Sequence, residues 1–157
     1  REEAQEPMST ALETMREWLS TYDGDGAGLL SQLAIDYADR VPNCASLFPG
    51  GLIETRRRTD LLGNVRVENA YNFALYTVMA KAPGEDAGAT LNAEWQMAFQ
   101  EWVQAQSVRG LAPMFGDEPR GERITAQNGA IYSADGEGTA VYAIQLSVSF
   151  TKHYQKG

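Results

Sequence analysis

The chain offers few side chains that could act as a nucleophile or a general base. Among its 157 residues there is one histidine, His153, and one cysteine, Cys44. A Ser-His-Asp or Cys-His arrangement would have to use His153, but a catalytic base must be held close to its target, and His153 follows the core pattern of the last predicted strand. We therefore interpret His153 as a solvated residue. We interpret Cys44, which has no cationic neighbour in the sequence, as a buried or half-buried thiol.

Metal and nucleotide motifs are equally sparse. One Cys and one His exclude a zinc site built from four such ligands. Residues 23–28 have the spacing of the start of a calcium loop, but alanines occupy the fifth and twelfth positions, where oxygen ligands are needed. We interpret this stretch as a turn that ends a helix. Because neither GxGxxG nor GxxxxGK[ST] occurs, no nucleotide cradle of those types and no cofactor are expected.

Two carboxylate pairs, Glu85-Asp86 and Asp117-Glu118, fall in predicted loops. A glycosidase could use two such carboxylates, but the separation of the groups in space cannot be read from the sequence. We interpret both pairs as solvated.

Arg56, Arg57 and Arg58 form the one dense basic cluster of the sequence. On a strand, Arg57 faces away from the other two, so the cluster is not one flat phosphate-binding patch. Two interpretations stay open. The arginines either lie on a solvated edge or pair with Glu54 and Glu68 across a hairpin, or they form salt bridges with a neighbouring subunit.

The elements that must position these residues begin with a helix over residues 10–22. Its first residues match a Thr-x-x-Glu capping box, and apolar residues follow at helical spacing. Residues 29–37 could begin a strand or a short helix. Pro42 and Pro49 should then break the chain into short pieces joined by loops.

From Leu52 to Ala82 the apolar period changes to two, which predicts a hairpin with its turn at residues 61–64. A loop at 83–88 follows. A second helix is expected from about Thr90 to Val108, with Gly110 as its C-terminal cap.

The C-terminal third predicts more strand. After a loop at 111–121, Glu122–Gln127 is expected to pair with Ala130–Ser133 across Asn128-Gly129, a pair of residues that tolerates the positive φ of a tight turn. Alternating apolar residues predict the last strand from Tyr142 to Phe150.

Helices and antiparallel strands segregated in this way predict an α+β fold. We expect a mainly antiparallel sheet built from two hairpins or a meander, with two principal helices packed on one face. The length suits one domain, residues 8–157, preceded by a flexible leader at residues 1–7. Met8 looks like a natural start, so the leader is expected to be an expression remnant or an upstream extension.

Composition narrows the class of protein. With 13 Lys+Arg against 21 Asp+Glu, the net charge of −8 argues against a protein that holds DNA mainly through its phosphates. No apolar run approaches the ~20 residues that cross a bilayer, and the N-terminus lacks the pattern of a signal peptide. A lone cysteine indicates a reducing compartment or a buried thiol. The composition therefore favours a soluble, intracellular, acidic domain.

Several segments carry a resemblance to a known family. They are an opening helix at 10–19, a strand at 69–73, an aromatic-x-Glu-Trp helix at 99–102, a loop containing Leu and Pro at 110–116, and a Thr-Ala-x-Tyr-x-Ile-Gln strand at 139–145. From Met8 onward the chain resembles small phage and prophage proteins encoded among the head–tail joining genes. These are often called minor capsid or tail terminator proteins.

The resemblance implies a structural role in virion assembly. Such a protein caps the growing tail tube as a homo-oligomeric ring, usually of six subunits, and joins it to the head connector. The implied partners are other copies of the chain, the tail tube protein and the head–tail connector protein, with DNA only passing through the lumen and no membrane contact. The implied location is the head–tail junction of the virion, and the host cytoplasm during assembly.

The expected site is therefore an interface, with no catalytic, cofactor or metal residue. The hairpin tip with Leu61, Leu62 and Asn64, together with Arg56, Arg57 and Arg58, is expected to contact the adjacent subunit or the tube. The loops at 83–88 and 111–121 are expected to meet the other neighbouring component.

Two alternatives stay open. One is another head–tail connector or minor capsid component of similar size. The other, from a different class, is a small ligand-binding domain or enzyme whose site is assembled from scattered residues. The scarcity of His, Cys and Lys counts against the second, since the only lysines are Lys81, Lys152 and Lys156.

Overall fold

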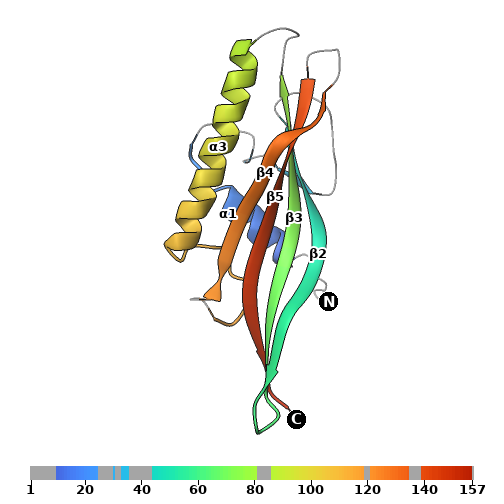
Figure 1. Cartoon of the computed structure of the whole chain (residues 1–157), viewed down its shortest axis with the longest axis vertical. Helices are drawn as coiled ribbons and strands as arrows, with labels where there is room; N and C mark the ends of the chain where they lie inside the picture. Colours follow the sequence, from blue (N-terminus) through green and yellow to red (C-terminus); the bar gives the residue numbers. More distant parts are fainter. Residues whose placement is uncertain are drawn as a thin grey trace, which may run out of the picture.

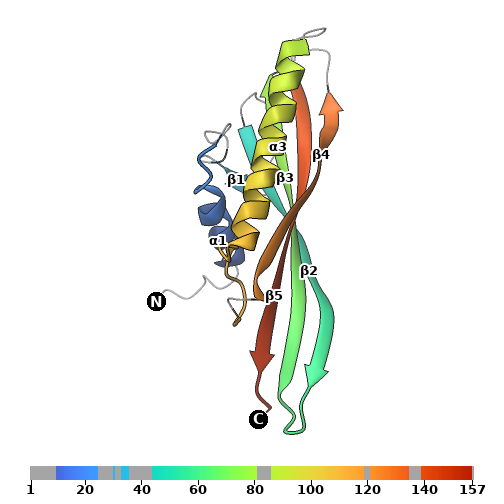
Figure 2. The same cartoon turned by 60° about the vertical axis from the view of Figure 1, so that its left-hand side comes forward.

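The computed structural model describes residues 10–24, 30, 33–35, 44–80, 86–118, 121–134 and 139–156. A long twisted sheet forms one layer, and the helices lie on one side of it (Figures 1 and 2). The strand order is β1-β2-β3-β5-β4, with antiparallel hairpins β2–β3 and β4–β5 and with β1 parallel to β2. The predicted α+β class is confirmed. The elements are α1 (Thr10–Leu19), β1 (Ala34–Ile35), β2 (Cys44–Thr59), β3 (Val65–Ala80), α3 (Asp86–Val108), β4 (Arg123–Ala134) and β5 (Thr139–Tyr154).

The two central strands, β3 and β5, pair along their whole length. The ladder runs from Val65 opposite Tyr154 to Ala80 opposite Thr139. The predicted alternation is confirmed, because every second side chain of the middle of each strand is buried on the face that carries the helices. These buried side chains include Val67, Phe73, Leu75, Ile144, Leu146 and Val148.

The expectation that Pro49 breaks the chain is wrong. Strand β2 continues through this position, with Pro49 opposite Phe73, and the ladder shifts register before Gly51. Gly51 has a φ of 102°, which a glycine adopts without steric cost. Among the described residues, β1 pairs only with Ser46 and Leu47 of β2. On the side of β2 away from β3, no described strand therefore lies beside Pro49, and an edge tolerates a residue that cannot donate to a ladder.

The tight turn expected at Asn128-Gly129 is also wrong. Strand β4 runs straight past it, with Gln127 opposite Gln145 and Ala130 opposite Ala143. Two residues of β4, Asn128 and Gly129, thus lie opposite one residue of β5, Ile144, which is a β-bulge. Since β5 is long enough to pair with all of β4, the extra residue is absorbed as a bulge and the strand does not fold back on itself.

Helix α3 begins at Asp86, earlier than the expected Thr90, so residues 86–88 are helical and not part of a loop. Along the outer edge of β4, α3 contacts the sheet through polar side chains. Gln100 Nε2 donates to the carbonyl oxygen of Ala126 (3.2 Å), and the hydroxyl of Ser107 accepts from the amide of Ile124 (3.1 Å). These bonds satisfy backbone groups on the side of β4 that no strand covers.

The predicted cap at Gly110 is confirmed. Gly110 has a φ of 76°, its amide donates to the carbonyl of Ser107 (3.2 Å), and the amide of Leu111 donates to that of Gln106 (2.8 Å). This pair of bonds is a Schellman motif, which ends a helix and satisfies its last carbonyl groups.

Helix α1 ends at Leu19, with turns at residues 20 and 21, and packs beside α3 (Figure 2). Trp18 lies 4.6 Å from Trp102 between ring centroids, and its indole donates to the carbonyl of Leu111 (2.8 Å). Tyr22 makes an edge contact with Phe99 at 5.4 Å. An aromatic cluster therefore joins α1 to α3 over the centre of the sheet.

Some expectations fall outside the described part of the chain. They are the leader at 1–7, the capping side chain of Thr10, the turn at 25–28, Pro42, the side chain of Cys44 and the Glu85-Asp86 pair. The ambiguous stretch 29–37 contains a helical residue at Leu30 and the short strand β1.

Phe99→Ala should lower the free energy of unfolding by about 3–5 kcal/mol, the usual cost of truncating a buried phenylalanine. The Phe99 side chain is fully buried and contacts Trp95, Trp102 and Tyr22. Urea denaturation measures the loss. Gln104→Ala, at an exposed position of the same helix, is the control and should stay within about 0.5 kcal/mol of the wild type. Equal losses in the two variants would contradict the packing described.

Candidate functional site

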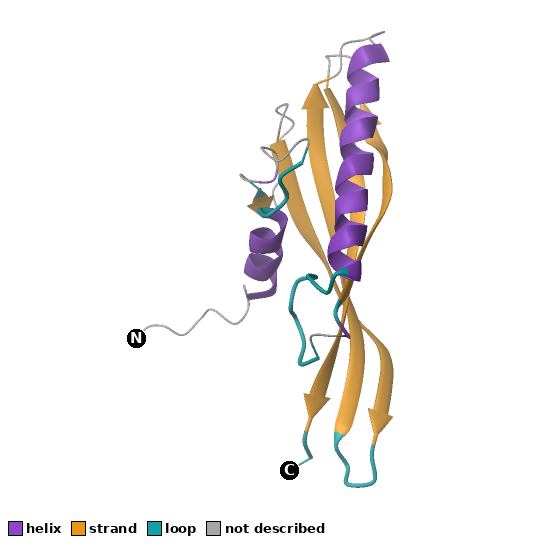
Figure 3. Ribbon diagram, turned by 90° about the vertical axis from the view of Figure 1, so that its left-hand side faces the viewer, coloured by secondary structure: helices purple, strands orange, loops and turns teal. Residues whose placement is uncertain are grey.

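Beyond the start of β4, the sheet continues without a helix over it. Strand β4 pairs from Arg123 opposite Ser149, and past this point β2, β3 and β5 project as three strands and a turn (Figures 1 and 3). We call this projection, residues 52–70 and 149–156, the arm. It contains the six residues expected to contact the adjacent subunit or the tube, Arg56, Arg57, Arg58, Leu61, Leu62 and Asn64.

The turn of the arm is held by its own hydrogen bonds. The Asp60 carboxylate accepts from the amides of Leu62 and Asn64, each at 2.9 Å, and Gly63 has a φ of 89°. The Asn64 side chain donates to Asp60 and accepts from the amide of Lys156 (3.3 Å), which ties the end of β5 to the turn. The Asn64 side chain therefore stabilises the turn through bonds within the chain. Leu61 and Leu62 are the turn residues whose side chains are exposed for contact with another molecule.

The surface of the arm is rich in exposed apolar side chains. Leu61 is fully exposed and Leu62 is 80% exposed. Leu52, Ile53 and Tyr154 are each more than half exposed. Single exposed apolar residues are ordinary, but a group at the end of a projection indicates a surface that another molecule covers.

The bulge in β2 decides how the arginines lie. Thr55 is the extra residue between Glu54 and Arg56. Arg57 makes two bonds to the Glu54 carboxylate on its own strand, at 2.8 and 2.9 Å. The bond from Arg57 holds the pKa of Glu54 below its ordinary value.

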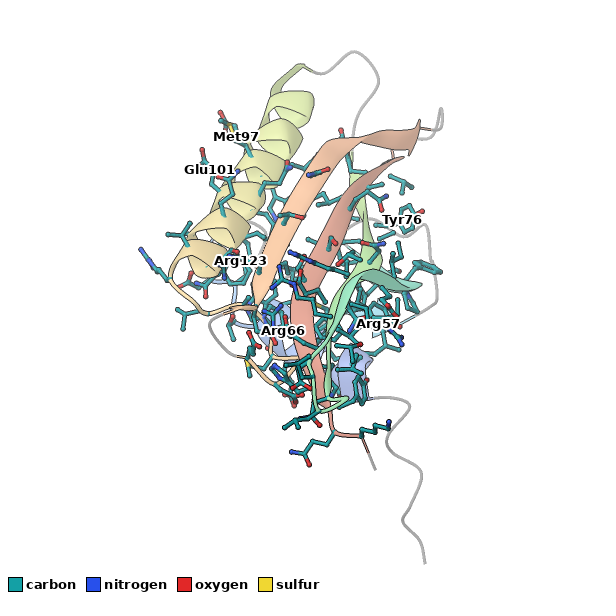
Figure 4. The ribbon with its side chains drawn as sticks, turned by 60° about the horizontal axis from the view of Figure 1, so that its bottom comes forward. Arg57, Arg66, Tyr76, Met97, Glu101 and Arg123 are labelled. Atoms are coloured by element: carbon teal, nitrogen blue, oxygen red, sulfur yellow. The ribbon has the colours of Figure 1, made fainter. Side chains whose placement is uncertain are left out.

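Pairing of the arginine cluster across the hairpin, one of the alternatives that the sequence left open, is not found among the described residues. Register confirms that Arg57 faces away from Arg56 and Arg58, because Arg57 lies opposite Val67 while Arg56 lies opposite Glu68. Glu68 pairs instead with Arg66 of its own strand. Arg56 and Arg58 are exposed and form no ion pair with a described residue. Figure 4 shows the side chains of this region, with Arg57 and Arg66 labelled.

The Asp117-Glu118 pair is not simply solvated. Glu118 binds Arg66 through both carboxylate oxygens (3.1 and 3.2 Å) and lies 2.8 Å from Nε2 of His153. The bond from Arg66 holds the pKa of Glu118 below its ordinary value. His153 is half exposed and belongs to β5, so the contacts of Glu118 with Arg66 and His153 join the loop after α3 to two strands of the arm.

Asp117 covers the edge of β5 where β4 is absent. Its amide donates to the carbonyl of Thr151 (2.7 Å), and its carboxylate accepts from the amide of His153 (2.7 Å). A side chain added at Gly116 would overlap the backbone of Thr151, so the close approach of the loop requires glycine there. The exposed edge of an arm strand is thus blocked against pairing with another chain.

Glu122, which the sequence did not single out, anchors this loop. Its side chain is 2% exposed, and its carboxylate accepts from the amides of Phe115 (3.2 Å) and Gly116 (2.8 Å). Burial raises the pKa of Glu122 above its ordinary value, and the two amide bonds oppose this shift. A glutamate at the start of a strand gives no signal of burial, because its partners are backbone groups seven and six residues away.

A catalytic or metal-binding arrangement is not found in the described part of the chain. Its His, Cys, Asp and Glu side chains form no group of three or more that could hold a metal ion. An open hollow of about 580 Å³ beside the turn is lined by Arg58, Arg66, His153 and Tyr154, but His153 is engaged with Glu118. None of the described helices is long and apolar enough to cross a membrane.

Comparison with models of known protein families gives no match. Comparison with curated protein sequences gives none either.

Glu122→Gln should remove a pH dependence of stability. Because burial raises the pKa of Glu122 above 4.5, the folded chain binds more protons than the unfolded chain between the ordinary and the raised pKa. The contribution of Glu122 to stability is complete below the ordinary pKa and is lost as the pH rises through the raised one. The free energy of unfolding of the wild type should therefore fall across this window relative to that of the variant.

Urea denaturation from about pH 4 to about pH 8, which brackets the ordinary glutamate range, measures this difference. Glu101→Gln, at an exposed position, is the control and should follow the wild type. A wild-type advantage over Glu122→Gln that grows with pH would contradict the assignment.

Proposed function

We propose that this chain is a structural virion protein of a phage or prophage, of the tail-terminator kind. In this proposal it forms a ring that caps the tail tube and joins it to the head connector. The observation that supports it is the arm, a projection of three strands whose apolar tip, Leu61 and Leu62, is covered by nothing in the described chain. The resemblance of the sequence to the head–tail joining proteins is the reason to propose a ring at the head–tail junction.

An arm at one end of a molecule favours contact between unlike surfaces. A contact of this kind is heterologous, and successive copies close into a ring when each is rotated by a fixed angle. The arm is held by hydrogen bonds at Asp60 and Asn64 and by ion pairs at Arg57 and Arg66. A projection constrained in this way can set the angle between neighbours, which a flexible loop could not do.

The remaining surfaces are proposed to meet other components. The described part of the loop after α3, residues 111–118, carries exposed Leu111 and Met114 and is the proposed contact with the tail tube protein or the head–tail connector.

The net charge of −8 suits a passage through which DNA slides, because acidic walls repel phosphates. Retention of a duplex oligonucleotide by the assembled ring in a gel-shift experiment would contradict this part of the proposal.

The molar mass in solution tests the ring. We expect light scattering across a concentration range, alone or with tail tubes as template, to give a mass near six times the 17.2 kDa of one chain. Electron microscopy of the same sample should show annular particles. Wild-type protein that stays monomeric and also fails to bind tube ends would contradict the proposed function.

Leu61→Glu/Leu62→Glu should weaken self-assembly at least about tenfold, since about 1.4 kcal/mol of lost contact changes an association constant by ten. The free energy of unfolding should change by less than about 0.5 kcal/mol, because both side chains are exposed. Thr125→Glu/Gln127→Glu is the control, a matched double change at two exposed positions of β4 away from the arm and from every proposed contact. Unchanged assembly of the leucine variant would show that the tip is not the contact.

A further inference from the structure

Charge is unevenly divided between the arm and the rest of the chain. The arm holds six Lys and Arg against three Asp and Glu, a net charge of +3. The remainder holds seven basic and eighteen acidic residues, a net charge of −11. The arm is therefore basic, while the remainder of the chain, which we call the body, is acidic. Opposite charges favour contact between the arm of one copy and the body of another.

The outer face of α3 is the surface of the body that best matches the arm. Its exposed positions recur at spacings of three and four, so they form one row along the helix, which we call the outer stripe. Met97 is 63% exposed and Val108 is 87% exposed. Figure 4 shows Met97 and Glu101 pointing away from the sheet. The outer stripe consists of Glu94, Met97, Glu101, Gln104 and Val108.

The chemistry of the two surfaces is complementary. On the stripe, glutamates precede and follow Met97 by about one turn. On the arm, Arg56 and Arg58 lie just before Leu61 and Leu62. The arginines are about 7 Å apart along their strand and the glutamates about 10 Å apart along their helix, a difference that long side chains can bridge.

The lengths of the two surfaces also agree. The arm part of β2, from Leu52 to Thr59, spans about 23 Å at ~3.3 Å per residue. The outer stripe, from Glu94 to Val108, spans about 21 Å at ~1.5 Å per residue. The arm points away from α3 of its own chain (Figure 3), so the partner stripe belongs to another molecule.

A protein surface fits the arm better than nucleic acid does. Arg57 and Arg66 are already bound to carboxylates of their own chain, and this leaves fewer cations for phosphates. The apolar side chains at Leu52, Ile53, Leu61 and Leu62 gain nothing from a phosphate backbone but are covered in a contact with Met97 and Val108.

We infer that the arm of one copy docks along the outer stripe of α3 of a second copy, with Arg56 and Arg58 facing Glu94 and Glu101 and the leucines, which lie beyond Arg58 at the tip, facing Val108. This inference rests on the proposed function, which supplies the ring. It adds the surface that receives the arm. Each copy then gives one arm and receives one, so the contact repeats around a closed ring.

Two charge-reversed variants test the docking. One is Arg56→Glu/Arg58→Glu on the arm, and the other is Glu94→Arg/Glu101→Arg on the stripe. Each alone should weaken assembly at least about tenfold in light scattering, because every contact then opposes like charges. An equimolar mixture should assemble again. In an alternating ring, a reversed arm meets a reversed stripe and a normal arm meets a normal stripe.

Glu17→Arg, an exposed charge reversal on α1, is the control and should assemble as the wild type does. Failure of the mixture to assemble, or no effect of either variant, would overturn the docking while rings of the wild type would still support the function. A wild type that is monomeric at every concentration would also overturn the docking, and binding to tube ends would then decide the function separately. Salt-dependent binding of duplex DNA that Arg56→Glu/Arg58→Glu abolishes would replace the protein partner with nucleic acid.

Discussion

The pairing of β3 with β5 is the interaction on which the rest of the molecule depends. It joins residues between 59 and 89 positions apart, from Ala80 with Thr139 to Val65 with Tyr154, with β2 and β1 added beside β3 and β4 added beside β5. The buried side chains of the two strands form the floor on which α3 packs, and their far ends form two of the three strands of the arm. The covered core and the uncovered projection are thus two ends of one ladder.

Polar side chains control which parts of this sheet are open to other chains. Gln100 and Ser107 of α3 bind backbone groups of β4, and Asp117 binds those of β5 beyond the start of β4. The loop that carries Asp117 is itself anchored by Glu122. The edge of the sheet along β4 and the arm part of β5 is thus blocked against added strands, whereas the β2 edge stays free of a described strand beyond Leu47.

The sequence predicted the features that depend on local pattern. Alternation placed β3 and β5 on the correct face, and Gly110 was identified as a cap, because period and glycine geometry are properties of neighbouring residues. Prediction from the sequence failed where strand pairing with residues remote in sequence decides the local structure. Asn128-Gly129 became a bulge because β5 continues beside it, and Pro49 stays in a strand because no described strand pairs with the outer edge of β2 there. The arm was predicted as a hairpin, but its third strand and the burial of Glu122 come from residues remote in sequence.

The third strand of the arm has a consequence for when the arm can form during synthesis. Residues 149–156 are synthesised about eighty positions after the hairpin that they complete, at roughly 5–20 residues per second. Until they leave the ribosome, β3 lacks its central partner and the turn lacks the bond from Lys156 to Asn64. Nascent chains therefore present an unfinished arm until this strand has been translated and has paired with β3.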